Sequence, residues 1–156
     1  MKANYQIILA EDHVRFRGEI KKIINKIPGV EIVGEAGEGH ELFELLETSR
    51  PDLLLLDISM PNLRGMQATQ AIKFRYPEVK VILMVMDNEK EYFSHAIAAG
   101  ADGILLKQNS AIDLRSAIQK IRRGGRYFPG LADEKRFDGD TAKINPFGRL
   151  TLLSFC

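Results

Sequence analysis

The stretch that decides the fold of this chain is residues 51–57, Pro-Asp-Leu-Leu-Leu-Leu-Asp. Pro51 ends any helix that precedes it, and the four leucines are apolar at consecutive positions rather than at alternate ones. A strand that is apolar on both faces is typical of the centre of a parallel sheet, because helices cover both faces of such a sheet. We therefore predict a central parallel strand at residues 52–57.

On either side of this strand, short apolar runs alternate with longer segments whose apolar residues recur at helical spacing. The other strands are predicted at residues 5–9, 30–33, 79–85 and 103–106. Helices are predicted at residues 13–26, 39–49, 66–75, 90–99 and 110–123. Strict alternation indicates right-handed crossovers, and the chain is too short for a closed eight-stranded barrel. The predicted fold class is α/β, an open, doubly wound, five-stranded parallel sheet.

Composition and charge exclude several classes of protein. The 156 residues are 45% hydrophobic, which is enough for a real core and excludes a disordered or fibrous chain. The formal net charge is +1, so no global field holds the chain on nucleic acid or on an anionic membrane. The only cysteine, Cys156, excludes a disulfide framework and a cysteine zinc site.

The two ends of the chain carry less pattern than its middle. Residues 1–13 hold only a four-residue apolar stretch, which predicts neither a signal peptide nor a membrane span, and we expect a cytoplasmic protein. From Arg126 onwards, proline, glycine and mixed charge occur without a sustained period. We predict one domain at residues 1–124 and a linker or tail at residues 125–156.

Charged side chains stand where three of the predicted strands end. Glu11 and Asp12 follow the first strand, Asp57 ends the third, and Lys107 follows the fifth. The carboxyl ends of parallel strands meet at one edge of the sheet, so we expect these groups to converge there. Clustered carboxylates raise one another's pKa unless a cation intervenes, and Mg²⁺ with its oxygen ligands fits such a cluster. Lys107 would then face the same bound anion as a point charge.

Each of these residues also has a purely structural interpretation. Asp12 precedes a helix and could be its N-cap, while Glu11 could be solvated. Asp57 could simply end a strand, and Lys107 could be a surface lysine. Convergence of all four favours the site. The glycine-rich residues 34–39 are a weak dinucleotide signal, because they follow the second strand, lack the GxGxxG spacing and carry acids.

Three segments together resemble a bacterial response-regulator receiver domain. They are Ile-Leu-Ala-Glu-Asp-His at 8–13, Pro-Asp-Leu-Leu-Leu-Leu-Asp-Ile-Ser-Met-Pro-Asn-Leu-Arg-Gly at 51–65, and Ala-Ile-Ala-Ala-Gly-Ala-Asp-Gly-Ile-Leu-Leu-Lys at 96–107. The similarity covers about residues 4–124, and the third segment resembles the NarL/FixJ (LuxR-type) family. The resemblance implies a flavodoxin-like receiver fold with strand order 2-1-3-4-5.

The resemblance also implies a role for each residue of the acidic site. Asp57 would be the phosphoacceptor, and Lys107 would contact the phosphoryl group. Glu11, Asp12, Asp57 and the backbone carbonyl of Ser59 would hold Mg²⁺. The implied partner is a sensor histidine kinase or a phosphotransfer protein. The chain would be a two-component phosphoacceptor switch in transcription regulation, one that assists its own phosphorylation and dephosphorylation, rather than an enzyme.

A different class of function stays open beside this one: a receiver-like interaction module that works without phosphorylation. Two departures from the family pattern favour it. Val85 stands where a threonine or serine hydroxyl normally bonds the phosphoryl oxygen, and Ile104 where a tyrosine or phenylalanine normally rotates inward. Valine has nearly the shape of threonine but offers no hydrogen bond, so we expect phosphorylation to survive with weaker coupling to the far face. The alternative is that a nearby side chain donates the missing hydrogen bond to the phosphoryl oxygen; the candidates are Ser59, Asn62 and Asn88.

The resemblance implies a contact surface as well. Helix four, strand five and helix five are the expected protein-contact face and homodimer interface, and Tyr92, Phe93 and Ile104 add apolar side chains there. Helical spacing nevertheless favours core burial of at least one of them.

Receivers of the NarL/FixJ type usually precede a DNA-binding helix-turn-helix domain. Arg-Leu-Thr at 149–151 resembles the opening of such a domain, but only five residues follow. A truncation, a frameshifted gene and an arbitrary cut are the open interpretations. We expect no DNA binding by this chain, since the basic residues at 120–126 suit a helix C-terminus.

Overall fold

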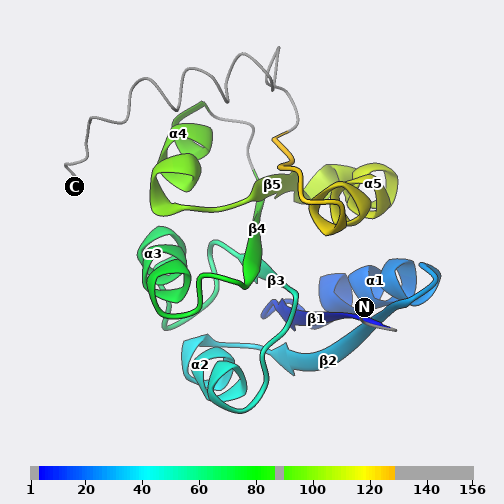
Figure 1. Ribbon diagram of the computed structural model, residues 1–156, viewed down its shortest axis with the longest axis horizontal. Helices are drawn as coiled ribbons and strands as arrows, with labels where there is room; N and C mark the ends of the chain where they lie inside the picture. The colour runs from blue at the N-terminus through cyan, green and yellow to red at the C-terminus, as the bar shows by residue number, and fades with distance from the viewer. Residues whose placement is uncertain (1–3, 87–89, 129–156) are drawn as a thin grey trace.

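A parallel sheet forms the middle layer of the molecule (Figure 1). The computed structural model describes residues 4–86 and 90–128. The strands are β1 (Tyr5–Ala10), β2 (Val30–Ala36), β3 (Leu53–Asp57), β4 (Lys80–Val85) and β5 (Gly103–Leu106). Every neighbouring pair is parallel, and the order is β2-β1-β3-β4-β5. The predicted fold class and strand order are confirmed.

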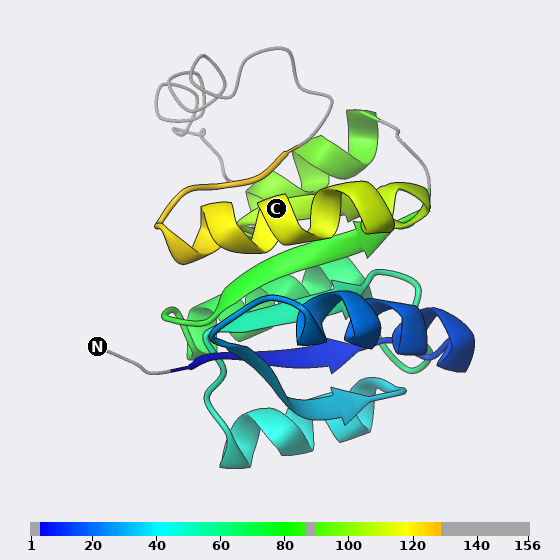
Figure 2. The same ribbon diagram turned by 90° about the vertical axis from the view of Figure 1, so that its right-hand side faces the viewer.

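Helices cover both faces of this sheet. They are α1 (Val14–Asn25), α2 (Gly39–Thr48), α3 (Gly65–Arg75), α4 (Lys90–Ala99) and α5 (Ser110–Arg122), with a short 3₁₀ turn at Lys107–Asn109. Figure 1 shows α2, α3 and α4 on one face and α1 and α5 on the other, and Figure 2 looks onto α1 and α5. None of the helices in the described ranges is long and apolar enough to span a membrane.

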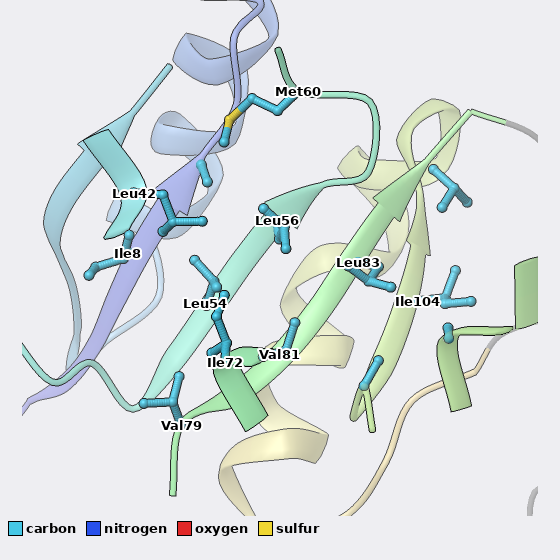
Figure 3. Packing of buried hydrophobic residues seen from close by; sticks show 14 of the residues in the cluster. Ile8, Leu42, Leu54, Leu56, Met60, Ile72, Val79, Val81, Leu83 and Ile104 are labelled. Carbon is cyan, nitrogen blue, oxygen red and sulfur yellow. The ribbon is translucent and has the colours of Figure 1, made fainter. Parts of the chain in front are cut away.

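The leucine run at β3 is central because both of its faces are covered. All five residues of β3 are buried. Leu54 and Leu56 pack with the α2, α3 and α4 side (Figure 3), whereas Leu53 and Leu55 belong to the cluster beneath α1 and α5. Neighbouring residues of a strand point to opposite faces, and each buried leucine contributes about 1.5–3 kcal/mol. The run therefore joins two cores and fixes the strand that ends in Asp57.

The glycine-rich residues 34–39 do not form a phosphate-cradling loop. β2 continues to Ala36, with Gly34 paired to Ile8 across a register shift in β1. Glu38 is the N-cap of α2, and its carboxylate accepts a hydrogen bond from the His40 N–H at 2.8 Å. The expected end of this strand at residue 33 is wrong, because pairing with β1 extends the strand through a segment whose glycine and acids locally favour a loop.

The chain does not leave the domain directly at the end of α5. Tyr127 forms a parallel bridge with Gly103 of β5, and Phe128 is buried. Residues 129–156, which include the segment 149–151 that resembles a helix-turn-helix opening, lie outside the described residues.

Candidate functional site

The carboxyl ends of three strands bring the expected charged residues together. Glu11 follows β1, Asp57 ends β3, and Lys107 follows β5. The Lys107 Nζ atom lies 3.1 Å from Glu11 Oε1 and 3.2 Å from Asp57 Oδ1. The side chains of Lys107, Glu11 and Asp57 are only 9%, 0% and 1% exposed. The ammonium is thus shared by two buried carboxylates.

Asp12 completes the acidic cluster from the solvent side. Its side chain is exposed, and one of its carboxylate oxygens lies within 4.8 Å of oxygens of both Glu11 and Asp57. The N-cap of α1 is His13, one residue further on. The interpretation of Asp12 as a helix cap is therefore wrong, and the structure places Asp12 with the other two acids.

Short-range hydrogen bonds orient both buried carboxylates. Glu11 Oε2 accepts from the backbone N–H of His13 at 3.0 Å. Asp57 Oδ1 accepts from both the backbone N–H and the hydroxyl of Ser59, each at 3.0 Å. The loop that supplies Ser59 then turns into α3 at Gly65, where a Cβ would lie 2.9 Å from the Ile58 backbone. The two hydrogen bonds from Ser59 thus hold Asp57 Oδ1 in place, whereas Asp57 Oδ2 takes part in neither.

Two buried carboxylate oxygens in the described ranges accept no hydrogen bond: Glu11 Oε1 and Asp57 Oδ2. Glu11 Oε1 still has the Lys107 ammonium 3.1 Å away as an ion-pair partner. Asp57 Oδ2 belongs to a cluster of three carboxylates, of which Glu11 and Asp57 share the Lys107 ammonium. Unsatisfied buried acceptors are rare in native proteins, and a bound ion or an ordered water is a common partner for them. Oxygen ligands with excess negative charge fit a hard divalent cation such as Mg²⁺.

The environment shifts the pKa values of the two buried carboxyls in opposite directions. Burial raises the pKa of Glu11 above its ordinary value; the Asp57 charge adds to this, and the His13 N–H and Lys107 oppose it only in part. Burial alone would raise the pKa of Asp57 as well. The hydrogen bond from the Ser59 N–H and the charge of the Lys107 ammonium lower it by more, so the net pKa of Asp57 lies below its ordinary value. The Asp57 carboxyl is therefore ionised at neutral pH.

The structure adds two residues that the sequence pattern did not single out. The Arg17 guanidinium donates to the Glu11 backbone carbonyl at 2.9 Å and lies 3.5 Å from the Glu35 carboxylate. The Phe16 ring lies 5.1 Å from Lys107 Nζ, within the range of a cation–π contact. Helical spacing marks Phe16 as an apolar residue of α1 but does not reveal which ammonium it meets, because Lys107 is far away in the chain.

The two positions that depart from the family pattern are fully buried. Val85 pairs with Leu106 and Ile104 pairs with Leu83, and both belong to the core beneath α2, α3 and α4. Among the alternative donors, the Ser59 hydroxyl already bonds Asp57 Oδ1.

Asn62 and Asn88 are the other two candidate donors of this hydrogen bond. Asn62 is exposed in the β3–α3 loop with a φ of 57°. Asn88 lies outside the described residues.

The other apolar residues expected on the contact face are mostly buried too. Phe93 and Ile104 are 3% and 0% exposed, and Tyr92 is half-buried. The expectation that at least one of them belongs to the core is confirmed.

Comparison with known proteins agrees with this geometry. The family described as response regulator receiver domain matches residues 7–119. The chain is 37% identical over 122 residues to the transcriptional regulatory protein DegU of Brevibacillus brevis, a match covering 78% of this chain and 52% of that protein. It is 33% identical over 118 residues to the nitrate/nitrite response regulator protein NarL of Escherichia coli K12, covering 76% and 55%. The chain spans about half the length of these curated relatives.

Solved structures give the same assignment. The non-phosphorylated receiver domain of the stress response regulator RcsB from Escherichia coli superposes with a TM-score of 0.77 at 29% identity, covering 81% of this chain and 98% of that one. A LuxR-family two-component response regulator from Aurantimonas sp. SI85-9A1 gives 0.77 at 25% identity, covering 94% and 98%. The matched family, the strand order and the acidic cluster agree, and the chain belongs to the response-regulator receiver domain family, with homologues of the NarL/LuxR type.

Proposed function

We propose that this chain is a phosphoacceptor switch that takes a phosphoryl group onto Asp57 from the phosphohistidine of a sensor histidine kinase or a phosphotransfer protein. The observation that carries the proposal is the unpaired, buried Oδ2 of an Asp57 that is anionic at neutral pH. The Lys107 Nζ atom lies 3.2 Å from Oδ1, the other oxygen of the same carboxylate. A nucleophile beside a fixed cation is what transfer to an aspartate needs.

The proposed reaction forms one bond and breaks one. The free Asp57 oxygen attacks phosphorus, the phosphorus–nitrogen bond to the donor imidazole breaks, and the electron pair of that bond stays on the imidazole. The product is an acyl phosphate on Asp57. Lys107 holds the carboxylate and neutralises charge on the transferring group, and burial keeps bulk water away from Glu11 and Asp57.

Three acidic side chains and one backbone oxygen would hold the metal. They are Glu11, Asp12 and Asp57, with the backbone carbonyl of Ser59. Bound Mg²⁺ supplies neutralisation of the phosphoryl oxygens. The fit rests on the excess of carboxylates over cations and on the unpaired Asp57 oxygen.

A groove beside the site offers a place for the donor protein. Its volume is about 700 Å³, and it lies between α1 and the start of α5 with Lys107 in its lining. The apolar part of the lining comes from Phe16, Ile20, Ile23, Met86 and Ala111. An apolar groove next to the acceptor suits a docking protein segment.

The first expected result is a single phosphorylation at Asp57. Acetyl phosphate with Mg²⁺ should add one phosphoryl group to the wild type, seen by intact-mass spectrometry, and none to Asp57→Ala. Asp52→Asn is the matched control, because Asp52 precedes β3 at the end of the strand opposite to Asp57. There its carboxylate accepts a hydrogen bond from the Gln6 N–H. This control should be labelled like the wild type. A label that persists in Asp57→Ala places the acceptor elsewhere and overturns the proposal.

Removal of one carboxylate should weaken Mg²⁺ binding. Asp57→Asn takes away a ligand and one negative charge of the cluster, so we expect at least about ten-fold weaker binding, since loss of even a residue outside the ligand shell costs that much. Isothermal titration of Mg²⁺ into the wild type, Asp57→Asn and Asp52→Asn measures the difference. Equal affinities in all three would remove Asp57 from the site.

A second candidate function is a receiver-like module that binds partners without phosphorylation. It is favoured by the buried Val85 and Ile104, which leave phosphorylation with no hydroxyl and no aromatic ring at the usual relay positions. A chain that is phosphorylated on Asp57 but binds its partners equally well in both states would support this alternative.

The relatives of this chain suggest which process the switch would regulate. Of the relatives, DegU is a transcriptional regulatory protein and NarL is a nitrate/nitrite response regulator protein. We propose a role in two-component regulation of transcription, with a receiver at residues 1–124 and a linker or tail at residues 125–156. The chain would act through protein contacts on the face of α4, β5 and α5, including contact with a second copy.

A further inference from the structure

The segment that follows α5 turns back onto the edge of the sheet. We name residues 125–128 the strap. Gly124, with a φ of +93°, ends the helix, a conformation that favours glycine. Figure 1 shows this segment, in orange, returning from the end of α5 to β5.

The strap covers the open edge of β5 with two backbone hydrogen bonds. The Ile104 N–H donates to the Tyr127 carbonyl at 2.8 Å, and the Tyr127 N–H donates to the Asp102 carbonyl at 3.0 Å. β5 is the last strand in the sheet order, so without the strap these two groups would face outward unpaired. Unpaired groups on an edge strand are a template for pairing with another chain.

A side chain anchors the strap. Phe128 is 2% exposed and lies in the same buried cluster as Ile104 and Phe93 of α4. The centroids of the Phe93 and Phe128 rings are 6.5 Å apart, with the rings tilted by 51°. The Arg126 guanidinium carbon lies 5.9 Å from the centre of the Phe128 ring. The strap therefore covers apolar surface between α4 and β5 as well as backbone groups.

The sequence of β5 is adapted to this contact. A Cβ on Gly103 would lie 2.6 Å from the Tyr127 carbonyl oxygen, a distance that a side chain cannot adopt without displacing the strap. Glycine in a strand interior costs stability and marks a place where another backbone approaches closely. Here the approaching backbone is the chain's own strap.

We infer that the strap is an intramolecular guard: it keeps the α4–β5 contact face closed, and its release lets β5 pair with a second copy of this chain. The inference rests on the proposed contact face and not on phosphorylation. A second copy is the occupant because release leaves backbone groups at Asp102 and Ile104 that another β5 edge could satisfy, next to the apolar surface that Phe128 covers. Self-association is then limited by the strap.

Two variants release the strap by independent routes. Phe128→Ala removes the anchor, and Gly103→Ala pushes the strap away from the strand without altering it. Each has a matched control. Phe74 is an aromatic residue that is 91% exposed, and a Cβ on Gly18 would have no atom within 4 Å, so Phe74→Ala and Gly18→Ala make the same chemical changes where nothing is packed.

The test combines a local and a global measurement, without phosphoryl donor. In the wild type and both controls, the Ile104 amide should be protected from hydrogen exchange, and sedimentation velocity should show a monomer at all concentrations. In Phe128→Ala and Gly103→Ala, exchange at Ile104 should be at least about ten-fold faster, and the sedimentation coefficient should rise with concentration. A peptide with the sequence of residues 123–128, added in excess, should reverse that rise in Phe128→Ala by covering the same edge, but not in Gly103→Ala, where the added Cβ blocks the Tyr127 carbonyl of the peptide as well.

Several results would overturn the inference. Fast exchange at Ile104 in the wild type, or unchanged exchange in the variants, means that the strap does not protect the edge. Fast exchange in a variant that stays monomeric means that the exposed edge does not bind a second copy. Circular dichroism checks that each variant is folded. If Phe128→Ala does not fold, Gly103→Ala alone tests the inference. Because no phosphorylation is involved, failure here leaves the acceptor role of Asp57 untouched.

Discussion

Lys107→Met should slow the phosphorylation of Asp57 by about 10²–10³-fold, the usual effect of removing one fixed group that stabilises charge in a transition state. Lys107 is the ammonium that lies within 3.2 Å of both Glu11 and Asp57, and methionine keeps its length while removing its charge. The loss also leaves two buried carboxylates without their cation. The measurement is the initial rate of labelling by acetyl phosphate at saturating Mg²⁺, followed by intact mass.

The control for this variant is Lys73→Met. Lys73 forms a comparable ion pair, 3.1 Å from Asp102, with side chains that are 18% and 13% exposed. It lies in α3 near the start of β4, at the opposite end of the strands from Asp57. Lys73→Met should therefore lose stability without losing rate. A labelling rate of Lys107→Met within about three-fold of the wild type would show that Lys107 is a structural counter-ion only.

Phosphorylation should change the conformation of the wild type less than that of Val85→Thr. A ligand shifts a two-state equilibrium only by its different interaction with the two states. A hydrogen bond from a hydroxyl to a charged phosphoryl oxygen contributes about 1.5–3 kcal/mol, so its gain should raise the ratio of switched to unswitched molecules about ten-fold or more. Val85 ends β4 next to the strand that carries Asp57 and is fully buried, so threonine fits its shape.

The measurement compares amide chemical shifts of α4 and β5 with and without beryllofluoride. Val85→Thr and the double variant Val85→Thr/Ile104→Tyr should respond more than the wild type. Val81→Thr is the matched control, because Val81 lies in the same strand and the same buried cluster but near the far end of β4. It introduces the same buried hydroxyl and should respond like the wild type. If the wild type already shifts as far as Val85→Thr, another donor such as Ser59 supplies the hydrogen bond.

Ile104→Tyr faces a constraint that the strap imposes. Ile104 is 0% exposed and shares its cluster with Phe93 and Phe128. A larger ring at this position has to displace one of these aromatic residues, and overpacking a core costs typically 1–3 kcal/mol. The single variant Val85→Thr therefore gives the clearer comparison.

Most of the fold could be predicted from local patterns. The leucine run identified β3 as the central strand because a strand covered on both faces needs apolar residues at every position. The alternation of strands and helices predicted the parallel sheet, and predicted helix ends fell within a residue or two of those observed. The strand ends also placed Glu11, Asp12, Asp57 and Lys107 at one edge, since all strands of a parallel sheet end on the same side.

What local pattern could not decide depends on contacts between distant residues. The extension of β2 to Ala36 follows from pairing with β1. The position of Tyr127 and Phe128 follows from pairing with the edge strand β5 and from packing of the Phe128 ring against Phe93. Neither segment has a periodicity of its own that marks it.

The sequence by itself determined the fold class, the central strand and the set of charged residues at one edge of the sheet, because periodicity, chain breakers and strand ends are properties of short stretches of chain. Only the tertiary structure decided how that charge is shared. One ammonium lies between Glu11 and Asp57, and the pKa of the first rises while the pKa of the second falls. Burial and distance set those shifts, and both are properties of the packed molecule that no stretch of sequence contains.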